Sequence, residues 1–438
     1  MTNIVKPSTI AGVMELLPDD QIAFDHIKTV IEDTFRKYQF MPLDTPLIEK
    51  DEILFAKGGG ETEKQIFKID SESRDMSLRF DLTVPLARYV AEHFSDLHFP
   101  FKRYHIGRVY RGERNQKGRY KEFYQCDIDI IGNNKLSIYN DALLPRVIYE
   151  IFTLLDFKGV TFHINNRKLL NGYFKSLGIE DSTEVLRTID KMAKIGKDAT
   201  IELLEKEVDH DKAVEMVDFL DNNLSNEEVI DKLSKEEGNN LFDEGLDELK
   251  TVYAYMKEFG IPDENIKLDL SITRGLDYYT STVYETFLDG YESIGSVCSG
   301  GRYEDLASNF SKQKLPGVGL SIGLTRLFYQ FQELGLVEKY KKDYTQILVV
   351  PMKDDFNFYA IDMVNALRAE GIKVDIYLEG GKFGKKLSYA DKMGIKNVII
   401  IGEEEYNNKV LSLKDMESGD QESLGLDQVC LLYTSPSP

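Results

Sequence analysis

Three patterns in the sequence predict an α+β domain with a helical insertion, followed by a small α/β domain. Residues 103–131 alternate apolar and polar side chains in two runs around a polar loop, which is typical of a long antiparallel hairpin. Residues from about 168 to 262 are highly charged and show helical periodicity with few strand signals. Residues 340–429 alternate between strand and helix patterns. We therefore expect a first domain over residues 1–335, with an antiparallel sheet and flanking helices, and a second domain over 340–429.

The first domain begins with a predicted amphipathic helix over residues 21–40, because apolar side chains recur there at helical spacing. Residues 41–48 are predicted to be extended, since Pro42 and Pro46 exclude a helix. The further elements expected before the insertion are strands at 76–80, 103–111 and 122–131 and a helix at 141–155.

Strand signals return after the insertion, where residues 267–272 and 283–287 are predicted to form two paired strands. Residues 317–323 form a glycine-punctuated strand pattern that leads into a helix over 324–334. In the second domain, the alternation of strands and helices predicts a small parallel sheet. Its strands are expected at 346–351, 373–378 and 397–401, and its helices at 357–370 and 382–393.

The last nine residues, 430–438, do not continue the pattern of the second domain. They contain two prolines and no helical or strand periodicity. We expect either foreign sequence that replaces a native C-terminal helix or a disordered tail.

The composition is that of a globular protein of 438 residues, with 42% hydrophobic and 29% charged side chains, which excludes disorder as the main state. No apolar run approaches the roughly 18 residues that cross a bilayer, so we expect no membrane contact. Cys126, Cys298 and Cys430 are too few and too far apart for a disulfide framework or a zinc site. A cytoplasmic protein without zinc is expected.

The net charge of −21 hides one concentrated basic segment. Residues 99–123 contain eight Lys or Arg side chains against only Glu113 and Glu122. Because local patches decide binding, an acidic protein with one such segment is predicted to have a specific anion site.

Arginines lie at both ends of the loop of the predicted hairpin. The rigid guanidinium forks of Arg111 and Arg119 suit the oxygens of a phosphate ester. A solvated basic hairpin would give the same charge pattern. Arg111 argues against that alternative, because it is expected inside an apolar strand, where an unpaired charge would be costly.

Four stretches of the chain resemble the class II histidyl-tRNA synthetases. Residues 110–125 are similar to the second class-defining motif of that family, and 317–327 to its third. Residues 274–279, Arg-Gly-Leu-Asp-Tyr-Tyr, resemble the first histidine-specific motif, and residues 299–304 resemble the second. The order and spacing agree from about residue 10 to 428, so the resemblance implies a class II catalytic domain and a C-terminal anticodon-binding domain.

The resemblance implies activation of L-histidine by ATP, with release of pyrophosphate, and transfer of the histidyl group to the 3′ end of tRNA(His). Arg111 would hold the α-phosphate as a catalytic and ATP-binding residue, Arg119 would bind the outer phosphates, and Arg326 would close over the triphosphate. Glu113 belongs to the same ATP-binding set. Arg274 would be the catalytic cation beside the attacking carboxylate; the alternative is a surface arginine on a turn.

The family pattern also implies a histidine pocket made of carboxylates, an amide and phenols, which can satisfy the polar groups of the substrate. Acids at positions 81 and 129 stand where glutamate is frequent in the family. For Tyr279, core packing is the alternative to a site role. Asp81, Thr83 and Gln125 match the positions that hold the α-amino group, Asp129 and Tyr279 those that contact the imidazole, and Tyr303 lines the same pocket.

Several partners follow from the resemblance. ATP is expected to arrive with Mg²⁺, and residues 37–53 resemble the first class motif, which builds a homodimer face. Lys382, Lys385 and Lys386 are candidates for tRNA phosphate contacts in the anticodon-binding domain. The alternative is an exposed, solvated helix face.

Two other functions compete with the enzyme. A synthetase paralogue that regulates ATP phosphoribosyltransferase would resemble the catalytic domain, but such paralogues usually lack the terminal domain and parts of the motifs. Another class II synthetase, such as that for threonine, would lack the stretch at 274–279 and would need zinc ligands. The histidine enzyme is favoured because this chain retains the motif residues Arg111, Gln125, Arg274, Tyr279 and Arg326.

Overall fold

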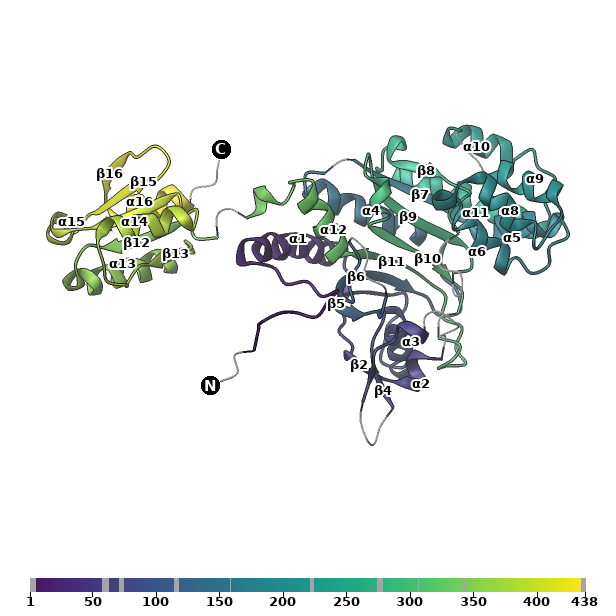
Figure 1. Cartoon of the computed structure of the whole chain (residues 1–438), viewed down its shortest axis with the longest axis horizontal. Coiled ribbons are helices and arrows are strands. Elements are labelled where there is room, and N and C mark those ends of the chain that lie inside the picture. Colours follow the sequence, from purple (N-terminus) through teal and green to yellow (C-terminus); the bar gives the residue numbers. More distant parts are fainter. Residues whose placement is uncertain are drawn as a thin grey trace. The chain divides into compact units, whose positions relative to one another are not determined.

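The computed structural model shows two compact units (Figure 1). It describes residues 5–56, 63–70, 75–113, 118–157, 159–220, 224–273, 279–305, 307–341 and 344–434. The first unit comprises Met1–Glu15 and Asp25–Leu334, and the second comprises Leu16–Phe24 and Gly335–Pro438.

The first unit is built on an eight-stranded sheet among the described residues. Its inner strands are antiparallel, as predicted, and the two edge strands β1 and β8 run parallel to their neighbours. Across the sheet, the strands are β1 (Met41–Pro42), β5 (Phe101–Tyr110), β6 (Glu122–Ile131), β11 (Gly317–Gly323), β10 (Cys298–Tyr303), β9 (Thr282–Leu288), β7 (Val160–Asn166) and β8 (Ile266–Leu268).

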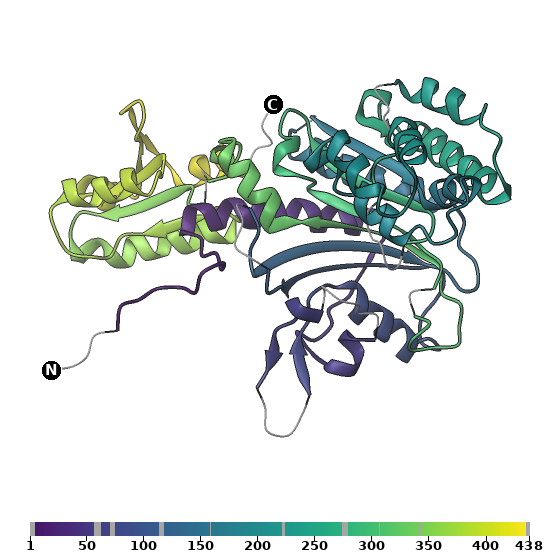
Figure 2. The same ribbon diagram turned by 45° about the vertical axis from the view of Figure 1, so that its right-hand side comes forward.

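Helices cover this sheet, and a small three-stranded sheet lies beside it (Figures 1 and 2). The side chains of Cys126, Ile128 and Ile130 on β6 are fully buried on one face. The flanking helices are α1 (Pro18–Lys37), α2 (Asp51–Leu54), α3 (Thr83–Glu92), α4 (Tyr139–Leu154) and α12 (Leu324–Glu333), and the small sheet contains β2 (Ile48–Lys50), β4 (Met76–Leu78) and β3 (Lys68–Ile69).

The predicted helical insertion is confirmed, and its helices gather beyond the β7–β8 edge of the sheet in Figure 1. Side-chain caps explain where several of them begin. The side chain of Asn166 accepts from two backbone N–H groups of α5, and that of Asn239 does the same for α11. The helices are α5 (Arg167–Ser176), α6 (Thr183–Ile189), α7 (Met192–Ile195), α8 (Lys197–Leu204), α9 (His210–Leu220), α10 (Asn226–Leu233) and α11 (Asn240–Glu258).

One strand pairing differs from the prediction. Residues 283–287 do not pair with the strand at 267–272, because β7 lies between β9 and β8. The predicted elements did not include β7, nor the glycine-containing strand β10. The predicted hairpin is confirmed, since β5 and β6 pair from Phe101 with Ile131 to Tyr110 with Glu122.

The second unit contains a mixed sheet, so the prediction of a parallel one is only partly correct. Its first three strands are parallel, and β15 and β16 add an antiparallel hairpin that the sequence reading missed. The order is β13 (Val374–Ile376), β12 (Ile347–Pro351), β14 (Asn397–Ile401), β15 (Leu411–Asp415) and β16 (Gln421–Leu424), and the helices are α13 (Asn357–Ala369), α14 (Phe383–Lys392), α15 (Glu403–Asn408) and α16 (Leu426–Thr434).

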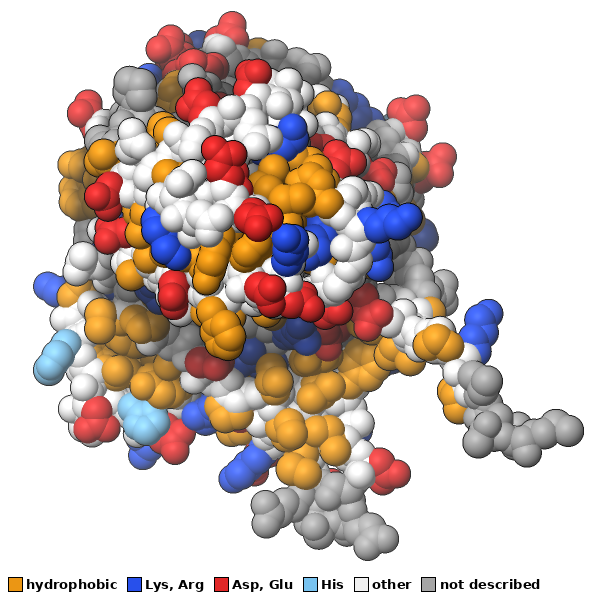
Figure 3. Space-filling model, turned by 90° about the vertical axis from the view of Figure 1, so that its left-hand side faces the viewer, with side chains coloured by type: hydrophobic (Ala, Val, Ile, Leu, Met, Phe, Trp, Pro, Cys, Tyr) orange, Lys and Arg blue, Asp and Glu red, His pale blue; other side chains and the backbone are white. Residues whose placement is uncertain are grey.

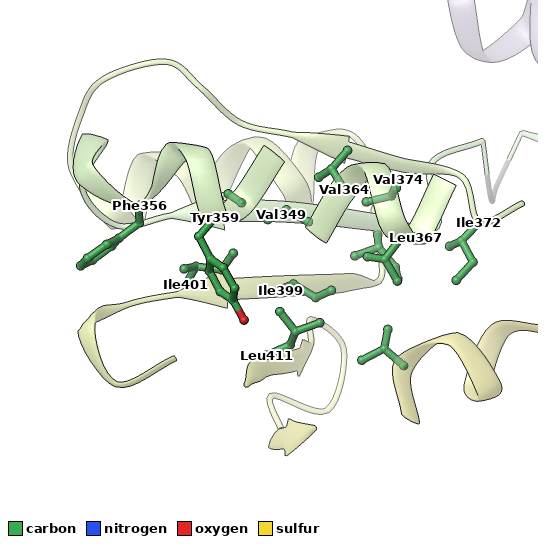
Figure 4. Close-up of a cluster of buried hydrophobic side chains, with 13 residues drawn as sticks. Val349, Phe356, Tyr359, Val364, Leu367, Ile372, Val374, Ile399, Ile401 and Leu411 are labelled. Atoms are coloured by element: carbon green, nitrogen blue, oxygen red, sulfur yellow. The ribbon is translucent and has the colours of Figure 1, made fainter. Parts of the chain in front are cut away.

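A cluster of buried apolar side chains fills the space between this sheet and α13 (Figure 4). Helix α16 joins the cluster through Val429, and Cys430 and Tyr433 pack against it. The alternative of a disordered tail is therefore wrong for residues 430–434, which belong to α16, whereas the replacement of a native helix by foreign sequence stays a prediction. Residues 435–438 lie outside the described residues.

Two findings bear on the expected class of protein. Within the described part of the chain, no helix combines the length and the apolar character needed to cross a membrane. All three cysteines are free thiols, and Cys126 and Cys298 are buried in the sheet.

A buried ion pair fixes strand β10 to helix α4. Arg302 and Asp141 are 4% and 0% exposed, and Arg302 Nη2 lies 2.7 Å from Asp141 Oδ2. The same guanidinium also donates to the backbone carbonyls of Leu136 and Ser137. Arg302 belongs to the second histidine-specific stretch, and its side chain therefore serves to hold β10 against α4.

Removing Asp141 should leave the Arg302 charge buried without its partner. We expect Asp141→Ala to lower the free energy of unfolding by about 3–5 kcal/mol, measured by chemical denaturation. Lys50→Ala is the control, because both side chains of the Lys50–Glu52 pair are more than 70% exposed, and it should cost less than about 1 kcal/mol. Equal effects of the two changes would contradict this assignment.

Candidate active site

The candidate site lies on the opposite face of the large sheet, where polar side chains of three strands meet. Alternation on β6 directs Gln125, Asp127 and Asp129 to this face, away from the buried apolar residues of the same strand. The register places His105 of β5 and Ser321 of β11 on either side of Asp127. The pairing of β6 with β5 and β11 therefore brings the basic hairpin and the glycine-rich strand together at one place.

The larger cavity at this face has a volume of about 770 Å³ and a cationic lining. Arg111 lines it, donates from Nε to the Phe80 carbonyl at 2.9 Å, and lies 5.1 Å from the centre of the Phe123 ring. It follows β5 and its side chain is 32% exposed, so the expected position inside an apolar strand is wrong. The stacked guanidinium faces the cavity with donors available for an anion.

Two further predicted arginines line the same cavity. Arg119 is 42% exposed and its Nη1 lies 3.1 Å from Oε2 of Glu113, which also lines the cavity. Arg326 stands in the first turn of α12, next to Gly295, where a Cβ atom would meet its guanidinium. The structure thus brings together all four predicted ATP-binding residues. The lining residues are Arg111, Glu113, Gly118, Arg119, Tyr120, Phe123, Gln125, Ser296, Val297, Ser299, Ser321, Gly323 and Arg326.

A smaller cavity of about 240 Å³ adjoins the first, because Ser321 lines both. We call it the acidic cavity, since it contains two carboxylates. Four of the residues predicted for histidine binding line it. Its lining residues are Thr83, Asp127, Asp129, Tyr279, Tyr303, Gly319, Leu320 and Ser321.

Asp129 is held in place by two neighbours. Its Oδ2 lies 2.6 Å from Nη2 of the fully buried Arg103, and its Oδ1 accepts from the Tyr303 hydroxyl at 3.1 Å. Burial raises the pKa of Asp129, and the positive charge of Arg103 opposes that rise. Part of the basic segment therefore serves a buried acid, not an external anion.

Asp81 has a different place from the other predicted residues. It is 8% exposed and its Oδ1 accepts the Val84 backbone N–H at 3.1 Å, which caps the start of α3. Burial raises the pKa of Asp81, and the Val84 bond and Arg111 lower it. Among the described residues, it is not part of the lining of either cavity. Gln125 lines the larger cavity and donates to Ser321 Oγ at 2.8 Å.

Tyr279 and Tyr303 line the acidic cavity and also pack against neighbouring side chains. Tyr303 is 1% exposed, and it packs with Ala87, Tyr279 and Phe310. The two interpretations of Tyr279, core and site, are therefore compatible. Arg274, the predicted catalytic cation, lies outside the described residues.

Sequence reading missed Asp127, although the signal was present. Asp127 lies two residues from both Gln125 and Asp129, so period-two alternation directs all three to the same face. It is 3% exposed and lines the acidic cavity. Burial raises the pKa of Asp127 to about 7, with further contributions from the neighbouring acids.

The predicted tRNA lysines of the second unit divide into two kinds. Lys382 and Lys385 are exposed at the start of α14. Lys386 is 6% exposed and its Nζ donates to the Pro351 carbonyl at 2.7 Å, so its predicted contact with phosphate is wrong.

The face of the molecule in Figure 3 carries basic, acidic and apolar side chains intermingled.

Three features together define a class II aminoacyl-tRNA synthetase. They are an antiparallel sheet with a basic hairpin, a glycine-rich strand that leads into an arginine-bearing helix, and a cationic cavity beside an acidic one. A family model described as Histidyl-tRNA synthetase matches residues 12–327, and one described as Anticodon binding domain matches residues 346–430. The chain belongs to the histidyl-tRNA synthetase family.

Relatives cover almost the whole chain. Histidine–tRNA ligase of Clostridium tetani is 54% identical over 97% of this chain and 98% of its own length, and that of Finegoldia magna is 54% identical over 97% and 99%. The crystal structure of histidyl-tRNA synthetase from Nostoc sp. PCC 7120 is similar with a TM-score of 0.88 and 38% identity, covering 97% of this chain and 98% of that one.

The fold also resembles that of a protein described as an ATP phosphoribosyltransferase regulatory subunit/histidyl-tRNA synthetase from Bacillus halodurans. The TM-score is 0.73 at 19% identity, over 90% of this chain and 99% of that one. At this identity the likeness shows the fold alone.

The absence of a side chain at position 319 makes room for Asp129. A Cβ atom at Gly319 would overlap Asp129 Oδ1, whereas one at Gly323 would find its nearest neighbour at 3.7 Å. We expect Gly319→Ala to lower the free energy of unfolding by about 1–3 kcal/mol through overpacking. Gly323→Ala is the matched control on the same strand and should leave it nearly unchanged. Chemical denaturation measures both, and similar values would contradict the steric argument.

Proposed function

We propose that this chain ligates histidine to tRNA(His) in two steps at the joined cavities. In the first, the histidine carboxylate attacks the α-phosphorus of ATP, an oxygen–phosphorus bond forms, and the bond to pyrophosphate breaks. In the second, the terminal ribose hydroxyl of the tRNA attacks the activated carbonyl and AMP leaves. One observation carries the proposal: a cationic cavity suited to a triphosphate shares Ser321 with an acidic cavity suited to an amino acid.

The larger cavity offers charge where ATP needs it. Arg111, which stacks on Phe123, is proposed to hold the α-phosphate, and Arg119 and Arg326 supply positive charge for the outer phosphates. These fixed donors stabilise the charge that develops on the α-phosphate during attack. Magnesium enters with ATP as part of the substrate. From the family resemblance, Arg274 contributes a further cation beside the attacking carboxylate.

The acidic cavity suits a small cationic amino acid. Asp129 and Tyr279 are proposed to contact the imidazole, and Thr83 and Gln125 to contact the α-amino group. Asp81 matches the family position for the same group, and it also accepts the backbone N–H of Val84, the residue after Thr83. A substrate without these polar groups would leave buried partners unsatisfied, which is the physical basis of selection.

A homodimer and tRNA binding complete the proposal. Met41, Leu47 and Ile48 are exposed by 60%, 43% and 48%, and they belong to the segment that resembles the dimer-forming motif. A second copy would cover these apolar side chains. The second unit is proposed to bind the anticodon, as the description of its family model implies.

Histidine-dependent exchange between pyrophosphate and ATP tests the first step without tRNA. We expect exchange with histidine and none with the other nineteen amino acids, because the acidic cavity selects an ammonium and an imidazole together. Folded protein that exchanges with no amino acid would contradict the enzyme and favour the regulatory paralogue, whose fold this chain shares.

The exposed lysines of α14 provide a test of tRNA binding. We expect the double change Lys382→Ala and Lys385→Ala to raise the KM for tRNA several-fold and to reduce the salt dependence of binding, because each lysine neutralises a phosphate. Pyrophosphate exchange should be unchanged. Lys353→Ala, an exposed lysine of the same unit paired with Glu403, is the control. An unchanged KM for tRNA would assign both lysines to a solvated surface.

A further inference from the structure

Asp127 has one carboxylate oxygen to which the described part of the chain donates no hydrogen bond. The side chain is 3% exposed and lines the acidic cavity, and its Oδ1 has no hydrogen-bond partner among the described residues. A buried polar atom without a partner is costly, and a charged one more so. A ligand that brings a donor to this atom recovers that free energy.

Ser321 connects Asp127 to a second unsatisfied acceptor. Ser321 lies opposite Asp127 in the register and lowers its pKa, and Ser321 Oγ accepts from Gln125 Nε2 at 2.8 Å. The amide of Gln125 therefore presents its NH₂ to Ser321 and its Oε1 elsewhere. Gln125 Oε1 likewise has no hydrogen-bond partner among the described residues. Asp127 Oδ1 and Gln125 Oε1, on one face of β6, are therefore two acceptors that suit a ligand group with more than one N–H.

Among the described residues, the cation that most lowers the pKa of Asp127 is Arg103, and Asp127 shares it with Asp129. Arg103 of β5 is engaged by Asp129, and burial lowers the pKa of His105, also on β5, to about 2, so that this imidazole is neutral. Asp129 on β6 and Asp81 before α3 add negative charge. The residues of β11 that line the cavity, Gly319, Leu320 and Ser321, carry no charge.

We propose that Asp127 is a specificity-determining residue whose Oδ1, together with Gln125 Oε1, receives the α-ammonium group of the amino-acid substrate. The inference rests on the proposed function and deepens it. It assigns different tasks to the two carboxylates of the acidic cavity. Asp129 is already held by Arg103 and Tyr303, whereas Asp127 is the acid with an open oxygen.

The proposal links substrate binding to a proton. Burial, with Asp129 and Asp81, raises the pKa of Asp127 to about 7, so at neutral pH a large fraction of the empty sites holds the acid protonated. An ammonium group favours the ionised form, which lowers the pKa of Asp127 and expels its proton. Well above pH 7 the acid is already ionised, and the same binding event releases no proton from it.

Calorimetric binding of three ligands to the full chain tests the assignment. Histidine and histidinol carry the α-ammonium group, and 3-(imidazol-4-yl)propionate lacks it. We expect Asp127→Asn to weaken histidine and histidinol about 10- to 100-fold, the size of one charge-assisted hydrogen bond. The affinity for imidazolylpropionate should change less than about twofold. The wild-type chain is the reference for all three ligands.

The outcomes separate the inference from the function on which it rests. A wild-type chain that binds no histidine would overturn the proposed function. The role of Asp127 alone would be overturned if the wild type binds histidine and the variant either keeps its affinity for all three ligands or loses the same factor for each.

A second measurement needs no variant and stands if Asp127→Asn does not fold. Titration of the wild type in buffers of different ionisation enthalpy counts the protons released on binding. At pH 7 histidinol should release more protons than imidazolylpropionate after the proton lost by each ligand's own imidazole is subtracted, and this excess should shrink when the pH is raised to 8. An equal count for both ligands at pH 7 would contradict the proposal.

Discussion

The site depends on the strict alternation of strand β6, which separates a dry face from a polar one. Cys126, Ile128 and Ile130 are fully buried on one side, and their alternate neighbours form the floor of the site on the other. A shift of register by one residue would place three polar side chains in the core and three apolar ones in the cavity. The hydrophobic core of the first unit therefore also fixes the direction in which its polar residues face.

Burying several carboxylates under one sheet face requires partners, and the basic hairpin supplies them. Arg103 lies opposite Asp129 in the register and neutralises it at 2.6 Å, which leaves Arg111 and Arg119 for the cavity. One basic segment thus serves two purposes that composition alone does not distinguish. Asp127, which has no such partner among the described residues, is the acid that a ligand must satisfy.

Glycines on the neighbouring strands make room for the side chains that line the site. A Cβ atom at Gly319 would overlap Asp129, one at Gly317 would overlap the Tyr303 ring, and one at Gly301 would press on Tyr279. The glycine-rich stretches that mark this family in the sequence are therefore required for close packing around polar side chains. Glycine is unfavourable inside a strand, and these close contacts explain why β10 and β11 nevertheless contain it.

The sequence by itself determined the periodicities, and with them the hairpin, the insertion, most elements of the second unit and the face on which Gln125 and Asp129 lie. It also contained the signal for Asp127. Which distant groups meet became apparent in the folded chain: β7 lies between β8 and β9, Arg302 pairs with Asp141, and Lys386 donates to the Pro351 carbonyl. The physical reason is that a local pattern specifies which way a side chain points. Its partner is set by strand order and packing across a hundred residues or more, which local periodicity does not encode.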